Sequence, residues 1–245
     1  MEEYPNCELL ILYMAVIFDA QRITQAIPNG EKYDDYFCSL YIRALQSSDE
    51  GTRIRAADSL VGFYMRKKHY DKAEEHLKYL SIQNPVRKIR QAEIYSETDR
   101  VREAYKTYEE LLFSDYGRAG MALHGMYQLA MKEVDMERAH MLVDKQRELA
   151  SCFDMGKYHE VLSELEIATW EKDADKTLII MKEMMESLTQ ICSFRESPLY
   201  EHMEFKNVSE EFLKEMRHNL RECFRDEESY GFLKNDKRWR ELVEL

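Results

Sequence analysis

The stretch from Ile54 to Pro85 limits the possible folds more than any other part of this sequence. Two apolar stripes with helical spacing are separated by a short basic segment. The first stripe is Leu60, Val61 and Tyr64, and the second is Tyr70, Ala73, Leu77 and Leu80. Asn84-Pro85 ends the second stripe, because proline interrupts a helix and favours the start of a new one. The pattern predicts a helical hairpin, two amphipathic helices joined by a short turn.

This hairpin resembles the tetratricopeptide repeat, a helix–turn–helix unit of 34 residues. With Ile54 as position 1, apolar or aromatic residues fall at positions 7, 8, 11, 17, 24 and 27, alanine at position 20 and proline at position 32. The small side chain of Ala73, at position 20, lets the two helices approach closely. Val61 departs from the family pattern, which prefers Gly or Ala there, and we expect the neighbouring Gly62 to relieve the crowding.

The same pattern recurs along the chain with decreasing clarity. The small residues that mark it are Ala73, Ala104, Ala139 and Thr177, at separations of 31, 35 and 38 residues. A single hairpin cannot bury its own apolar face, so a stack of hairpins is expected. Two more predicted helices, a buried one around residues 9–18 and one at about 33–46, form a degenerate first repeat. The segment 113–120 reads as a loop because it contains Gly117 and Gly120.

These patterns predict an all-α fold, a tetratricopeptide-like superhelix of four or five antiparallel helical hairpins with a C-terminal helical cap. The repeats are expected over residues 1–198 and the cap over residues 199–245. With 44% hydrophobic residues, the chain of 245 residues can bury a sizeable core. The cap is expected to contain a helix that begins near Asn207 or Ser209 and a last short helix around Trp239.

Charge and composition exclude several classes of function. The chain carries 35 basic and 47 acidic residues, a net charge of −12, which makes it a poor direct binder of nucleic acid. The apolar run from Leu9 to Phe18 is too short to span a membrane and lacks the flanks of a signal peptide. Five dispersed cysteines without a CxxC pair suit reduced thiols in a cytoplasmic protein.

Motifs for chemistry are scarce. The sequence has no P-loop, no GxGxxG and no GxSxG. Two Glu-x-x-His patterns, Glu137–His140 and Glu215–His218, match half of the ligand set of di-iron helical bundles. The alternative is that both arise by chance in a charged helical chain, with His140 near the outer rim of a repeat. We therefore expect neither an enzyme nor a cofactor or metal.

Resemblance to the repeat family also implies where a partner binds. Positions 2, 5, 9 and 12 of each unit line the concave wall of the superhelix. The candidate binding residues at these positions are Arg55, Asp58, Met65, Ile89, Glu93, His124, Gln128 and Met131. Such a mixture of polar and adaptable apolar groups suits an extended peptide or a partner helix. Alternatively, these side chains are merely solvated.

A basic cluster, Arg87, Lys88, Arg90, Arg100 and Arg102, has two interpretations. It is either a solvated helix face or an anchor for a peptide carboxylate or an acidic partner, since the guanidinium group matches carboxylate geometry.

The order of these segments resembles the C-terminal sensor half of XRE-type bacterial transcriptional regulators. The segments are a YPN-started first helix, the YDKAEEHL hairpin, degenerate repeats, SPLYEHMEFK and the FLKNDKRWREL end. In that family a helix-turn-helix domain binds DNA and the repeats sense a ligand or dimerise; here no helix-turn-helix precedes Tyr4. Three hypotheses follow: a sensor that binds a peptide or small ligand, a scaffold that forms a homodimer or docks a protein, and a helical metalloenzyme.

Overall fold

A computed structural model describes residues 7–24 and 30–244 of the chain. Within these ranges the chain forms α-helices and short 3-10 helices and no β-strand, so the predicted all-α class is confirmed. The YPN segment at residues 4–6 lies outside the described residues. None of the described helices combines the length and the apolar character that crossing a membrane requires.

Internal contacts divide the chain into two compact units, Met1–Leu111 and Leu112–Leu245, which we call unit 1 and unit 2 and describe separately. The predicted boundary at residue 198, between repeats and cap, stays a prediction. The segment that follows it packs against the helices that precede it, because Phe224, Tyr230 and Trp239 share one apolar core with Leu165 and Met181.

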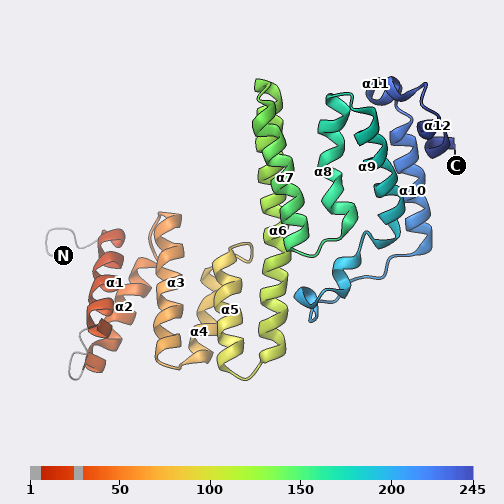
Figure 1. The fold of residues 1–245 in the computed structure, drawn as a ribbon. Coiled ribbons are helices and arrows are strands. Elements are labelled where there is room, and N and C mark those ends of the chain that lie inside the picture. The colour runs from red at the N-terminus through yellow and green to blue at the C-terminus, as the bar shows by residue number, and fades with distance from the viewer. Residues whose placement is uncertain (1–6, 25–29, 245) are drawn as a thin grey trace. The chain divides into compact units, whose positions relative to one another are not determined.

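Unit 1 consists of short helices in sequential order (Figure 1). They are α1 (Glu8–Thr24), η1 (Gly30–Tyr33), α2 (Asp34–Ala44), α3 (Glu50–Arg66), α4 (Tyr70–His76), η2 (Leu77–Tyr79) and α5 (Pro85–Glu97). The side chain of Asp49 accepts a hydrogen bond from the Thr52 amide and starts α3. Asn84 caps α5 in the same way, with Pro85 in its first turn. Helices α3 and α4 therefore form the predicted hairpin, and Ala73 is completely buried in it.

Helix α1 is buried on one face only. Ile11, Leu12 and Ala15 lie in the core of unit 1, together with Leu60 and Val61 of α3. The other face is apolar and exposed, and its large side chains are Leu9, Tyr13, Val16, Ile17 and Phe18. The expectation of a buried first helix was therefore half correct, because an unbroken apolar run does not reveal which face the fold covers.

Helix α6 (Val101–Glu133) begins in unit 1 and ends in unit 2 as one continuous helix (Figure 1). The prediction of a loop at residues 113–120 was wrong. Added Cβ atoms at Gly117, Gly120 and Gly125 would meet nothing within 4 Å, so no close packing requires a glycine there. Apolar flanks hold the helix instead, since Phe113 and Tyr116 pack in a core of unit 2.

Unit 2 continues with helices that cover the second half of α6 and with a C-terminal set that packs on α8 and α9. They are α7 (Met136–Cys152), α8 (Lys157–Trp170), α9 (Ala174–Ser187), η3 (Leu188–Gln190), η4 (Ser193–Glu196), η5 (Pro198–Tyr200), α10 (Glu210–Phe224), α11 (Glu227–Tyr230), η6 (Gly231–Leu233) and α12 (Lys237–Glu244). Tyr127 and Ala130 of α6 pack against Leu142 of α7 and Ile167 of α8. The helices predicted near Ser209 and Trp239 are both present.

Five turns between consecutive helices share one backbone geometry. Each turn contains a left-handed residue with φ between 52° and 58°: Lys68, Asp99, Val134, Asp154 and Lys172. The next amide donates a hydrogen bond to the carbonyl five residues earlier, at 2.9–3.1 Å, as from His69 to Tyr64. This 6→1 bond defines a Schellman motif. In four of the five turns a buried small residue follows five positions after the left-handed one: Ala73, Ala104, Ala139 and Thr177.

Val134 is the least suitable of these left-handed residues, because a β-branched side chain disfavours positive φ. It has few contacts to lose, since 65% of its surface is exposed. We expect Val134→Gly to raise the free energy of unfolding by about 0.5–1 kcal/mol, measured by urea denaturation. Ile179→Gly is the control, because Ile179 is similarly exposed inside α9 and should lower stability. If both glycine variants lowered the free energy of unfolding, the backbone at Val134 would not be strained.

The glycines of α6 give a second stability prediction. Gly117→Ala and Gly125→Ala should each stabilise the chain by about 1 kcal/mol, because alanine is the better helix former and the added methyl group has free space. Gly156→Ala should do the opposite, since Gly156 has φ 88° and the new Cβ would collide with Ser193. Urea denaturation of the three variants measures these effects. Destabilisation by the first two would mean that α6 is not a regular helix at these positions.

Candidate binding groove

Unit 2 contains a cavity of about 990 Å³ between α6, α7 and α8, which is also lined by Glu228, Ser229 and Tyr230 of α11. We call it the unit-2 groove. Helix α6 contributes the segment from Tyr116 to Tyr127, and α8 contributes the segment from His159 to Trp170. The size lies within the range of known ligand sites.

Large apolar side chains line this groove and stay exposed. Met121 is 70% exposed, Trp170 51% and Leu162 47%. When a ligand binds to apolar groups in a concave surface, the apolar surfaces of both the protein and the ligand are removed from water, which favours binding. Methionine and tryptophan also adapt to partners of different shape and polarity. The lining therefore favours a partially apolar ligand.

Two hydroxyl groups at the wall of the groove lack hydrogen-bond partners among the described residues. They belong to Tyr127, whose residue is only 1% exposed, and to Ser163. Burial, together with the charges of Glu166 and Glu171, raises the pKa of Tyr127 to about 12, so its hydroxyl keeps its proton. A buried polar group without a partner costs about 1–3 kcal/mol. Polar atoms of a ligand or of water that reached these hydroxyls would offset that cost.

His159 lines the groove from α8 and is held in one orientation. Its Nε2 atom is 3.0 Å from the carbonyl oxygen of Ile191. A carbonyl accepts only, so Nε2 carries the proton and Nδ1 remains an acceptor. Burial lowers the pKa of His159 below its ordinary value of 6.5, because desolvation disfavours the charged imidazole. His159 is therefore neutral near pH 7.

The predicted residues of unit 2 lie at or beside the groove. His124 lines it together with Met121, and its ring stacks on Tyr127 with centroids 6.0 Å apart. Gln128 donates a hydrogen bond of 2.8 Å to Glu166, which lines the groove from α8. Met131 is partly buried against the core formed by α6, α7 and α8, so most of its contacts are internal.

The opposite wall was missed by the sequence analysis, although a signal for it existed. The positional rule was applied to three units and not to the fourth. When Thr177 is taken as position 20 of the fourth unit, positions 2, 5, 9 and 12 become His159, Leu162, Glu166 and Thr169. All four line the unit-2 groove. The weak apolar pattern around Leu165 and Ala168 concealed this register.

The predicted residues of unit 1 have neighbours within that unit. Arg55 donates to the Tyr13 hydroxyl at 3.1 Å, and Met65 packs against the core. Arg90 forms ion pairs with Asp58 at 2.6 Å and with Glu93 at 2.9 Å. Ile89 remains exposed. Asp58 also lines a small pocket of about 210 Å³.

Most of the basic cluster has structural partners. Arg87 donates to the Leu80 carbonyl, Lys88 pairs with Glu110, and Arg100 pairs with Glu74 while its guanidinium lies over the Tyr95 ring. Arg90 differs, because it lies beside the small pocket of unit 1. Arg90 nevertheless pairs with Asp58 and Glu93, so the carboxylate-anchor interpretation stays a prediction.

The di-metal hypothesis gains no support from the described part of the chain, where no three His, Cys, Asp or Glu side chains gather as a group able to hold a metal ion. His140 Nε2 is instead 2.7 Å from Glu171 Oε1.

Comparisons with known proteins add no neighbour, since no family model, no curated protein and no solved structure matches the chain.

His159 makes stability depend on pH. Its pKa is lower in the folded chain than the ordinary value of 6.5, so the unfolded chain binds more protons just below pH 6.5. The neutral imidazole therefore stabilises the fold fully above pH 6.5, and this contribution is lost as the pH falls below that value. His159→Gln can still donate to Ile191 and should lose less thermal stability than the wild type between about pH 7.5 and pH 5.5. Thermal stability is measured by circular dichroism. Equal losses in the variant and the wild type would show that His159 is not the group responsible for the pH dependence.

Proposed function

We propose that this chain is a tetratricopeptide-like module that binds a peptide or a segment of a partner protein in the unit-2 groove. One observation carries the proposal. Of the positions that face a partner in the repeat family, two of the four in the third unit and all four in the fourth unit line one cavity, on opposite walls. Met121 and His124 supply one wall, and His159, Leu162 and Glu166 supply the other.

The recurring turn geometry supports the repeat interpretation. The left-handed residue, its 6→1 hydrogen bond and the small residue five positions later are spaced together by 31, 35 and 38 residues. Because the turns after α6 and α8 close in the same way, these two helices of unit 2 are expected to present corresponding positions to a partner. The expected superhelix is the architecture that this regularity favours.

The chemistry of the groove favours a peptide over a purely apolar small molecule. Exposed Met121, Leu162 and Trp170 suit alternate apolar side chains of a partner. The hydroxyls of Tyr127 and Ser163 are buried in the wall without partners among the described residues, so peptide amide and carbonyl groups would reach them only after side chains of the wall move. A preformed groove also limits the ordering cost of binding.

The regulatory part of the proposal rests on the resemblance to sensor regions of XRE-type regulators. In that setting, groove occupancy would control a cytoplasmic transcription factor, with homodimerisation as a further property. A docking scaffold is the alternative use of the same groove. Binding of a short free peptide would favour the sensor interpretation. Binding of folded partner proteins, without binding of free peptides, would favour the scaffold interpretation.

The groove is tested by selecting 12-residue peptides from a random phage library on the intact protein. We expect Leu162→Asp to weaken the enriched peptides at least about tenfold, because it places a charge among apolar contacts. Affinity is measured by isothermal titration calorimetry with synthetic peptides.

Ile179→Asp is the matched control, because Ile179 is 57% exposed on α9 and does not line the groove. It should leave the peptide affinity unchanged. Failure to enrich any peptide, or an equal loss in both variants, would contradict binding in the unit-2 groove.

A further inference from the structure

Unit 1 holds a second, smaller pocket whose chemistry differs from that of the unit-2 groove. Its volume is about 210 Å³, and its walls come from α1, α2, α3 and α5. Val16, Ala20 and Tyr41 supply apolar surface, while Asp58, Arg66 and Arg90 supply charges. A pocket of this size suits a molecule smaller than the drug-sized ligands of larger clefts.

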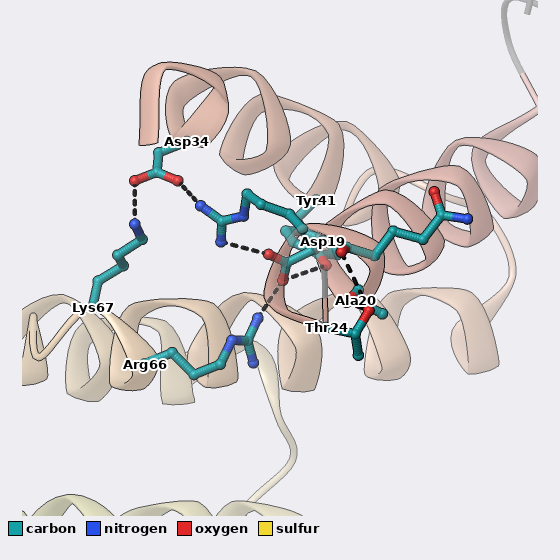
Figure 2. Close-up of polar contacts among 9 residues, drawn as sticks. Asp19, Ala20, Thr24, Asp34, Tyr41, Arg66 and Lys67 are labelled. Carbon is teal, nitrogen blue, oxygen red and sulfur yellow. Dashed lines mark hydrogen bonds and ion pairs between the residues drawn. The ribbon is translucent and has the colours of Figure 1, made fainter. Parts of the chain in front are cut away.

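Ion pairs hold the two arginines in place. Arg66 Nη2 bonds the buried carboxylate of Asp19, which also pairs with Arg22 (Figure 2). Arg90 uses Nε for Asp58 and Nη1 for Glu93. The hydrogen bond to Asp58 is the largest cause of the raised pKa of Arg90, so its guanidinium stays charged. Fixed guanidinium groups lose little freedom when they bind an anion.

The remaining terminal nitrogens of both arginines converge on Gly62. A Cβ atom at Gly62 would lie 3.3 Å from Arg66 Nη1 and 3.6 Å from Arg90 Nη2. Among the described residues, neither nitrogen has a hydrogen-bond partner. The two nitrogens are therefore within about 7 Å of each other, a gap that the two oxygens of one carboxylate span with charge-assisted hydrogen bonds of about 2.8 Å each. The absence of a side chain at Gly62 leaves this place open.

The charges around the pocket are balanced, which selects against a simple anion. Three arginines, Arg22, Arg66 and Arg90, face three carboxylates, Asp19, Asp58 and Glu93. Nearby Asp34 bridges Arg22 and Lys67 (Figure 2). The second oxygen of Asp58, Oδ2, has no hydrogen-bond partner among the described residues and can accept from an ammonium group. A zwitterion supplies a carboxylate for the unpaired arginine nitrogens and an ammonium group for the Asp58 oxygen, and it adds no net charge.

We propose that this pocket binds a free α-amino acid. Its carboxylate bridges Arg66 Nη1 and Arg90 Nη2 over Gly62, its ammonium group donates to Asp58, and its side chain lies toward Val16 and Ala20. The site is independent of the unit-2 groove and does not rest on the peptide proposal.

The test uses the full chain and the twenty standard L-amino acids as probes. Each is added to ¹⁵N-labelled protein, and shifts of the Gly62 amide are followed by NMR. We expect saturable shifts with at least one of them. Its N-acetyl form lacks the ammonium charge, and its primary amide lacks the carboxylate, so each should bind at least about tenfold more weakly.

Gly62→Ala keeps every charged group and places a methyl group where the carboxylate would bind. Alanine favours the helix, and the closest atoms belong to flexible arginine ends, so the variant should fold and lose binding at least about tenfold. Gly51→Ala, in the first turn of the same helix and away from the pocket, should bind as the wild type does.

Three results would overturn the proposal. The first is the absence of a saturable shift with all twenty amino acids. The second is an N-acetyl form that binds as tightly as the free amino acid, which would instead indicate a site for carboxylates in general, including peptide C-termini. The third is unchanged binding by the folded Gly62→Ala protein.

Discussion

The hydrogen bond that closes five of the helices across a left-handed residue is the constraint on which the rest of this structure depends. It reverses the chain within a few residues and fixes how far the next helix lies from the last one. In four turns it also places a small buried residue, such as Ala73 or Thr177, where the two helices touch. Within unit 2, the groove forms where the second half of α6 and α8 face each other.

Helical spacing and small residues were sufficient to predict the all-α class, the central hairpin and the markers of repetition. They were not sufficient for α6, because Gly117 and Gly120 read as loop residues while packing of Phe113 and Tyr116 outweighs a cost of about 1 kcal/mol per glycine. Helical spacing also did not predict that one face of α1 is exposed, because an unbroken apolar run has no polar side that would mark the exposed face. Of the predicted binding residues, His124 alone lines the unit-2 groove. The α8 wall was missed because Thr177 was not used to extend the register.

The two sites differ in the physical terms that govern binding. The unit-2 groove offers exposed apolar surface and two buried hydroxyls, so binding there depends on removing surface from water. The pocket of unit 1 offers fixed charges of both signs, so its selectivity depends on matching charge positions. The charge of the chain is also uneven, with 19 basic and 28 acidic residues in unit 2 against 16 and 19 in unit 1. Unit 2 therefore attracts cationic ligands from a distance more strongly than unit 1 does.

The continuity of α6 has a consequence for how the chain opens in solution. Its residues before Leu111 depend on unit 1, while Tyr127 and Ala130 depend on the apolar core shared with α7 and α8. When unit 1 melts, the helix can fray inward from Val101 and stop where packing with unit 2 begins. Amide protons along a single helix would then exchange with solvent in two cooperative groups, since local stability follows the packing around each segment and not the helix as a whole. The division between the units would be visible as a step in protection within uninterrupted secondary structure.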